Sequence, residues 1–216
     1  MAVITISRQY GSGGSTIAKL TAEHLGWQLV DNQFVDRVAE ELNLPPEEVA
    51  SRENRRPSLI ERLAANLVAS SPEDLIASET TGEHATPDLE MHRLTQAVIL
   101  EAVQHGHAVL VGRGAQFYLR NREDVLHVLV VAPRDVRVRR IQKRLDITEK
   151  EAEKKVANVD DARSDYVATH YQRKWADPAC YHVVINSGFL GYEQAADLIA
   201  ASASNLWEER RAKNEE

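Results

Sequence analysis

The chain has 216 residues, a net charge of −7 and 43% hydrophobic residues, which fits a globular protein with one sizeable core. Its negative charge argues against a general binder of nucleic acid or acidic membranes, because both require a basic surface. The single cysteine, Cys180, cannot form an internal disulfide, and no segment is long and apolar enough to cross a bilayer. We therefore expect a cytoplasmic protein that binds neither nucleic acid nor a membrane.

The start of the chain predicts a phosphate-binding turn. A short apolar strand over residues 3–6 leads into a glycine-rich segment, and a helix is expected over residues 14–25. The N–H groups in the first turn of a helix have no intrahelical partner, and the helix dipole favours negative charge there. We expect the N–H groups from Ser12 to Thr16 to surround a phosphate, with Mg²⁺ near the hydroxyl of Ser15 or Thr16.

This turn departs at two positions from the phosphate-loop pattern G-x-x-x-x-G-K-[ST]. Gly13 and Ser15 fit the pattern, whereas Arg8 stands at the first glycine and Gly14 stands at the lysine. The question is therefore whether the segment is a working phosphate loop without its lysine or only a tight turn.

Two other interpretations of the turn stay open at this point. The same glycines would suit a strand-to-helix turn with no ligand. Gly11 and Gly13, followed about twenty residues later by Asp31, partly fit a dinucleotide site, although Thr16 occupies the place of the third glycine. The histidines are scattered and no G-x-S-x-G elbow occurs, so neither a zinc site nor a serine nucleophile is expected.

Strand and helix patterns alternate along the rest of the chain. Further strands are expected over 27–30, 107–111, 125–131 and 181–185, and further helices over 33–43, 89–105, 134–145, 148–170 and 192–207. Residues 45–90, rich in charge, Ser and Pro, predict a lobe of short helices, and the charged tail 208–216 is expected to fray. Buried strands that alternate with helices indicate a three-layer α/β fold around a five-stranded parallel sheet.

Ligands of such sheets bind beyond the carboxyl ends of the strands, where two further candidates follow strands. Asp31 would orient a ribose or a base there, or it would cap the next helix. Arg113 lies between two glycines that leave space around its guanidinium, which suits bidentate contact with a phosphate. A surface ion pair is the alternative for Arg113.

The predicted helix over 134–145 concentrates positive charge in a net acidic protein. Its basic residues are Arg134, Arg137, Arg139, Arg140, Lys143 and Arg144. A solvated helix face is the ordinary explanation for such a run. We instead expect part of a closing lid, because phosphoryl transfer needs positive charge on the migrating group and exclusion of water.

Much of the chain resembles the cytidylate kinase-like proteins, relatives of bacterial cytidylate kinase among the nucleoside monophosphate kinases. The similar segments are residues 4–14, 30–32, 53–58, 109–114, 130–133, 160–163, 166 and 181–186. The resemblance implies a P-loop kinase fold with a core (1–44, 89–140 and 171–207), an acceptor-binding lobe (about 45–88) and a lid (about 141–170). It also implies ATP as donor, Mg²⁺ as cofactor and a small-molecule acceptor such as CMP or dCMP. Separately, the apolar helix faces would pack either within the chain or across a homodimer.

The resemblance implies roles for individual residues as well. Asp31 and Arg113 would face the acceptor, and Arg137, Arg140 and Arg163 would lie near the transferring phosphoryl group. The donor phosphates would be held by Gly11, Ser12, Gly13, Gly14, Ser15 and Thr16.

Cytidylate kinases carry a lysine where this chain has Gly14, and such a lysine neutralises charge on the β- and γ-phosphates. We hypothesise that Arg8, which lies in the loop itself, supplies this charge; Lys19 or a lid arginine would be the alternative source. The missing lysine also supports a second interpretation, a nucleotide-binding regulatory protein that has lost catalysis. A dinucleotide-dependent oxidoreductase is a third, and the arginine-rich helix adds nothing to it.

Overall fold

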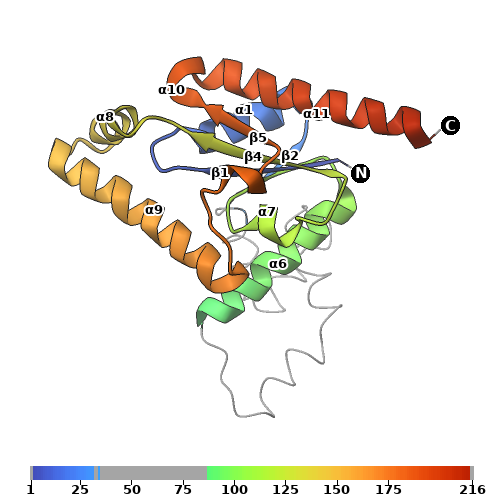
Figure 1. Cartoon of the computed structure of the whole chain (residues 1–216), viewed down its shortest axis with the longest axis horizontal. Helices are drawn as coiled ribbons and strands as arrows, with labels where there is room; N and C mark the ends of the chain where they lie inside the picture. The colour runs from blue at the N-terminus through green and yellow to red at the C-terminus, as the bar shows by residue number, and fades with distance from the viewer. Residues whose placement is uncertain (1, 32–33, 35–86, 215–216) are drawn as a thin grey trace, which may run out of the picture. The chain divides into compact units, whose positions relative to one another are not determined.

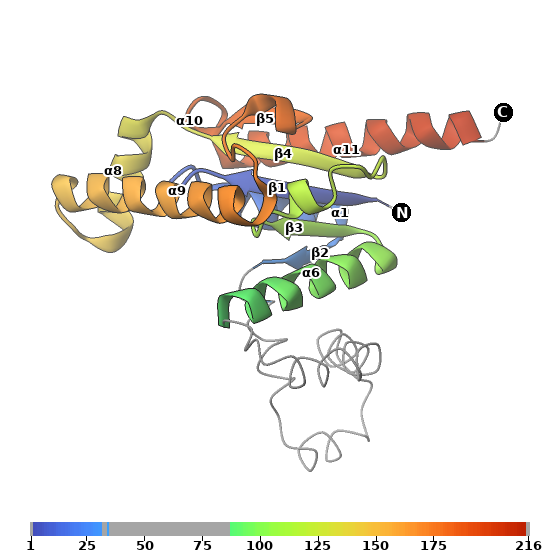
Figure 2. The same ribbon diagram turned by 60° about the horizontal axis from the view of Figure 1, so that its bottom comes forward.

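Five strands form the central sheet of the protein, whose computed structural model describes residues 2–31, 34 and 87–214 (Figure 1). The strands are β1 (Val3–Arg8), β2 (Gln28–Val30), β3 (Ala108–Val111), β4 (Val125–Val131) and β5 (Val183–Asn186), in the order β2-β3-β1-β4-β5. β1 pairs in parallel with β3 and β4, and β4 pairs in parallel with β5. Figure 2 shows β5, β4, β1 and β3 one below another in this order, with β1 near the centre.

The predicted three-layer α/β fold with a parallel sheet is confirmed. The helices are α1 (Gly14–Leu25), α6 (Pro87–His105), α7 (Ala115–Tyr118), α8 (Arg134–Leu145), α9 (Glu149–Tyr171), η1 (Pro178–Cys180), α10 (Ser187–Leu190) and α11 (Tyr192–Asn214). Figure 1 shows α1 and α11 on one face of the sheet, and α8 and α9 beyond the carboxyl ends of β1 and β4. Within the described residues, no helix combines the length and the apolar character needed to cross a membrane.

Alternate residues of β1 face a continuous apolar core between the sheet and the helices α1 and α11. Ile4 and Ile6 are fully buried in one cluster with Ile17 of α1 and Ile199 of α11. A fully buried aliphatic side chain contributes about 2 kcal/mol relative to an exposed one. This packing fixes the start of α1 against the end of β1, and so positions the glycine loop between them.

Local signals in the sequence located most of the described elements. Gly26 ends α1 in the left-handed conformation (φ 65°), and Thr148 with Glu151 forms a capping box at the start of α9. Three short elements were not predicted, namely α7, η1 and α10, because three or four residues carry no helical period. The expectation of a frayed tail was wrong up to Asn214, because α11 continues to that residue.

Contacts divide the chain into two units, residues 1–29 with 106–216, and residues 30–105. The first unit contains the glycine loop, α7 to α11 and most of the sheet; the second contains Asp31 and α6. The predicted helix over 33–43, apart from Phe34, and the predicted lobe up to residue 86 lie outside the described residues. The division into core, acceptor-binding lobe and lid stays a prediction.

The other face of β1 carries buried polar groups. Thr5 Oγ1 lies 2.8 Å from Nδ1 of His127 on β4, and the His127 ring stacks on His182 with centroids 4.8 Å apart. Burial, together with the neighbouring His182, lowers the pKa of His127 to about 4. Further along this face, Tyr181 donates from its hydroxyl to the carbonyl of Trp175 (2.6 Å), and burial raises the pKa of Tyr181 to about 12.

The low pKa of His127 predicts a loss of stability in mild acid. The unfolded chain binds a proton to this residue near pH 6.5, whereas the folded chain binds it only near pH 4. Stability supplied by neutral His127 is therefore present above pH 6.5 and falls by about 3 kcal/mol as the pH drops to about 4. Urea unfolding of wild type and His127→Gln at several pH values measures this difference, because titrating groups that do not contact His127 contribute equally to both.

The matched control is His105→Gln, which changes an exposed imidazole at the end of α6. Its stability over the same pH range gives the effect of removing an imidazole that is not buried. A His127→Gln protein that loses stability between pH 6.5 and 4 as steeply as wild type would contradict the assignment.

Candidate functional site

The glycine-rich loop between β1 and α1 leaves backbone N–H groups without helical partners. Gly13 is the N-cap of α1, and no side chain caps this terminus. The first hydrogen bond within the helix runs from Ile17 N to the Gly13 carbonyl (3.0 Å). The N–H groups of Gly14, Ser15 and Thr16 therefore precede the intrahelical ladder, which is the arrangement that binds anions.

Arginines from α8 and α9 hold the alternate carbonyls of this loop. Arg163 Nη1 donates to the carbonyl of residue 8 (2.6 Å), Arg137 Nη1 to that of residue 10 (3.1 Å), and Arg140 Nη1 to that of residue 12 (3.2 Å). Such charge-assisted bonds are stronger than neutral ones. Because these carbonyls are occupied by cations, their negative ends do not compete with an anion for the N–H groups of the loop.

Asp160 of α9 joins these arginines to the loop. Its carboxylate accepts hydrogen bonds from Tyr10 N (2.8 Å) and from Arg137 Nη1 (2.6 Å), and it lies 3.9 Å from Arg163 Nη1. The side chains of Arg137 and Asp160 are only 9% and 17% exposed, so this ion pair is largely removed from water. Burial lowers the pKa of Arg163, and the charge of Asp160 opposes this shift. Arg163 stays charged nevertheless, as arginine does in proteins.

A second group of side chains holds the loop from the end of β5. The Ser187 hydroxyl donates to the Ser12 carbonyl, and Arg140 Nη2 donates to the Ser187 carbonyl (3.0 Å). The Arg140 guanidinium also lies over the Tyr192 ring, 4.9 Å from its centroid. A Cβ on Gly13 would come within 2.3 Å of that ring, and Gly13 has φ 79°, so glycine is required there.

The Arg8 side chain starts at the end of β1, passes the first residue of α1 and ends at the loop after β3. A Cβ on Gly14 would lie 2.3 Å from Arg8 Cβ, and a Cβ on Gly112 would lie 1.8 Å from Arg8 Nη1. The stem of Arg8 therefore covers Gly14, and its guanidinium lies against Gly112. Among the predicted site residues, the structure thus brings Arg8 together with both glycine-containing loops.

Arg113 lies in the turn that follows β3, which is the neighbour of β1. The register pairs Ile6 with Val111, so the two turns leave the sheet at the same edge. Gly112, Arg113 and Gly114 all have positive φ (77°, 56° and 69°). The hydroxyl of Tyr171, at the end of α9, donates to the Arg113 carbonyl (3.3 Å). Residues with a bulky side chain rarely have a positive φ, and those that do cluster at functional sites.

Asp31 belongs to the second unit, and its local contact resembles a helix cap. Its Oδ1 accepts a hydrogen bond from the N–H of Phe34 (3.0 Å), three residues later, which is N-cap geometry. The proposed contact of Asp31 with an acceptor stays a prediction.

The structure also names site residues to which the sequence had assigned no role. Asp160, Tyr10, Ser187 and Tyr192 all contact the loop or its arginines. For Asp160 the available signal was its place in the family-like segment 160–163. For Ser187 it was the position directly after the last strand. The roles predicted for Arg137, Arg140 and Arg163 in phosphoryl transfer stay predictions; in this structure the three side chains bind loop carbonyls.

Comparisons with known proteins point to one family. The model of the cytidylate kinase-like family matches residues 3–188. A cytidylate kinase from a Shewanella species is 28% identical over 95 residues, which cover 44% of this chain and 41% of that protein. A uronate isomerase from Corynebacterium glutamicum is 32% identical over 110 residues, 51% of this chain and 21% of that protein. These matches therefore span less than half the length of either relative.

A solved structure shares the fold over almost the whole chain. It is an uncharacterized protein from Eubacterium ventriosum, with a TM-score of 0.67 and 21% sequence identity. The alignment covers 94% of this chain and 99% of that one. At this level of identity the likeness concerns the fold alone.

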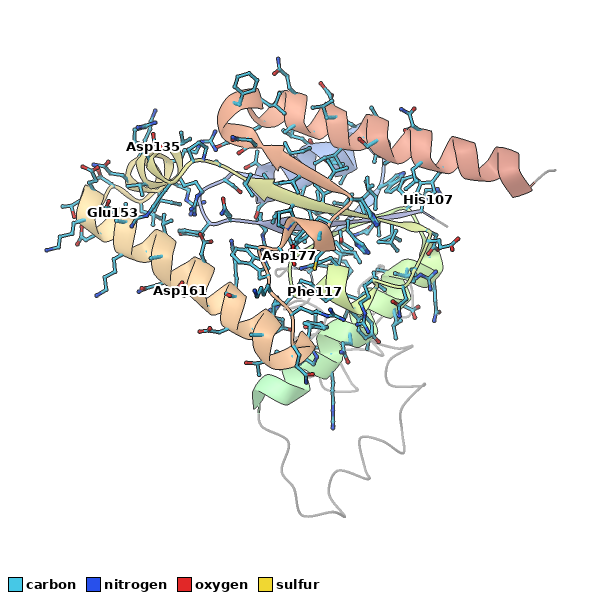
Figure 3. The ribbon with its side chains drawn as sticks, viewed as in Figure 1. His107, Phe117, Asp135, Glu153, Asp161 and Asp177 are labelled. Carbon is cyan, nitrogen blue, oxygen red and sulfur yellow. The ribbon has the colours of Figure 1, made fainter. Side chains whose placement is uncertain are left out.

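The buried Arg137–Asp160 pair predicts a strong effect of removing its negative charge. Asp160→Asn would leave the Arg137 guanidinium buried without a counter-ion, and we expect a loss of about 3 kcal/mol of unfolding free energy. Asp161→Asn is the matched control, because Asp161 is the exposed neighbour on α9 (Figure 3) and should stay within about 0.5 kcal/mol of wild type. Urea unfolding measures both. Equal stability of the two variants would show that the pair does not hold the loop.

Proposed function

Because the chain belongs to the cytidylate kinase-like family, we propose that it transfers a phosphoryl group from Mg·ATP to a small acceptor, most simply a nucleoside monophosphate such as CMP or dCMP. The observation that carries this proposal is the glycine loop, whose N–H groups at the start of α1 have no helical partner while its alternate carbonyls are bound by arginines. Such a preorganised set of donors suits a polyphosphate, because it needs no reorganisation when charge develops.

The donor-binding part of the proposal fits the chemistry of the loop. The backbone of residues 11–16 would hold the phosphates, because backbone N–H groups there approach an anion without side chains in between. The hydroxyls of Ser15 and Thr16, both exposed in the first turn of α1, would lie nearest to Mg²⁺, which prefers oxygen ligands. When bound, the ion would neutralise charge on the phosphates.

Arg8 is the proposed substitute for the missing lysine. Its guanidinium lies against Gly112, beside the turn that carries Arg113. A guanidinium offers two parallel donors to a phosphate and keeps its charge at any physiological pH. In the proposed mechanism, the chain accelerates transfer by positioning the two substrates and by stabilising charge, with little covalent chemistry of its own.

Arg113 and Asp31 remain the proposed acceptor-binding residues, and the lobe over about 45–88 would select the acceptor. Arg137, Arg140 and Arg163 would support transfer by holding the donor loop through the carbonyls that they bind here. A cytoplasmic location and a homodimer remain part of the proposal.

A nucleotide-binding regulatory protein is the second candidate function. The observation in its favour is the position of Gly14, where the Arg8 stem leaves no space for the lysine of an ordinary phosphate loop. A coupled assay with Mg·ATP and CMP separates the two candidates. Binding without turnover across nucleotides and acceptors would favour the regulator.

Replacing Arg8 tests its catalytic role. Arg8→Ala should lower kcat/KM for Mg·ATP by about a hundredfold or more, because one charged donor to the transition state is lost. Arg8→Lys should retain an intermediate value, because it keeps the charge but not the paired donors. The control is Lys19→Ala on the exposed side of α1, which should behave as wild type. Near-normal turnover by Arg8→Ala would contradict the catalytic role of Arg8. A lower kcat/KM for Lys19→Ala would assign that role to Lys19.

An acceptor screen tests the role of Arg113. ADP release from Mg·ATP is measured with a panel of nucleoside monophosphates and hydroxylated metabolites. Arg113→Asn is suitable because asparagine tolerates the left-handed backbone that Arg113 adopts (φ 56°). We expect at least about a tenfold higher KM for the acceptor, since an ion pair to its phosphate is lost, and unchanged affinity for Mg·ATP. An unchanged acceptor KM would remove Arg113 from the site.

A further inference from the structure

The side chains of positions 8 and 14 compete for one volume. A Cβ built on Gly14 would lie 2.3 Å from Arg8 Cβ and 2.9 Å from Arg8 Cγ, both far inside normal contact distance. These atoms form the base of the Arg8 side chain, so a rotation of its far end would not relieve the clash. The next neighbour, Val130 Cβ, is 3.4 Å away, which a real Cβ contact tolerates.

The backbone at Gly14 does not itself require glycine. Gly11 and Gly13 have φ near 80°, whereas Gly14 is the first residue of α1 and does not have a positive φ. An L-residue would therefore adopt this conformation without strain. Arg8, rather than the chain geometry, is what excludes a side chain from position 14.

The far end of Arg8 reaches the neighbouring turn. A Cβ on Gly112 would lie 1.8 Å from Arg8 Nη1 and 2.9 Å from Arg8 Cζ. At the other end, the Arg8 carbonyl accepts a hydrogen bond from Arg163 (2.6 Å). The Arg8 side chain thus starts on β1, passes over Gly14 and ends beside the turn that contains Arg113.

We propose that Arg8 and Gly14 are a reciprocal exchange of the first glycine and the lysine in the phosphate-loop pattern G-x-x-x-x-G-K-[ST]. One cationic side chain occupies the shared volume, and in this chain it starts from the strand rather than from the helix. The inference rests on the proposed function. It adds that the cation approaches the phosphates from the side of Gly112 and Arg113, where the donor and acceptor loops meet.

The exchange predicts that the cation can be moved back. The double variant Arg8→Gly/Gly14→Lys has the complete pattern, and removal of the Arg8 stem opens the space that the new side chain needs. Arg8→Gly/Gly14→Ala is the matched control, because it fills the same space without a charge. Binding of a non-hydrolysable ATP analogue with Mg²⁺, measured by titration calorimetry, is the first readout.

We expect Arg8→Gly to bind the analogue at least about tenfold more weakly than wild type, and the lysine double variant to recover most of this loss. The alanine double variant should stay as weak as Arg8→Gly. A lysine double variant no tighter than the alanine one, with a wild type that binds, would overturn the exchange. A wild type that binds no nucleotide would refute the proposed function instead.

A second readout needs no ligand and tests the shared volume alone. Gly14→Ala in the wild-type background should lower the melting temperature by several degrees, because the new methyl group overlaps Arg8. In the Arg8→Gly background the same change should be neutral or stabilising, since alanine favours a helix more than glycine does. An equal loss in both backgrounds would show that the two positions are independent and would overturn the exchange.

Discussion

Hydrogen bonds from Arg137, Arg140 and Arg163 to alternate carbonyls hold the glycine loop in one conformation. A glycine-rich segment loses more conformational entropy on ordering than any other, so it needs strong contacts to stay in place. Charge-assisted bonds supply them, and Asp160 balances part of the positive charge within 4 Å. With the carbonyls of residues 8, 10 and 12 occupied, the loop presents the N–H groups at the start of α1 and the exposed hydroxyls of Ser15 and Thr16.

The same contacts limit what α8 and α9 can do. Motion of these helices away from the loop would break the hydrogen bonds of Arg137 and Asp160 to the backbone of Tyr10. α9 also contacts the turn after β3, where Tyr171 binds the carbonyl of Arg113. One helix, α9, therefore contacts both loops at the carboxyl edge of β1 and β3.

Membership of the cytidylate kinase-like family and the packing around Arg8 explain different features of the loop. The family accounts for the position of the loop between a central strand and a helix, which is where a parallel sheet binds ligands. The packing accounts for the glycine at position 14, because Arg8 fills the space that a side chain there would need. Under the proposed function, the loop would be a variant of a phosphate site in which Arg8 supplies the positive charge.

The sequence alone determined the alternation of strands and helices, most of their ends, and the segment that forms the loop. These follow from apolar periodicity, capping residues and glycines, which act over a few neighbouring positions. Only the tertiary structure decided the partners of the arginines, since Arg163 and Arg140 meet the loop across 155 and 128 residues of chain. It likewise decided that Arg8 excludes a side chain at Gly14, because that clash depends on how a strand end meets a helix start in space.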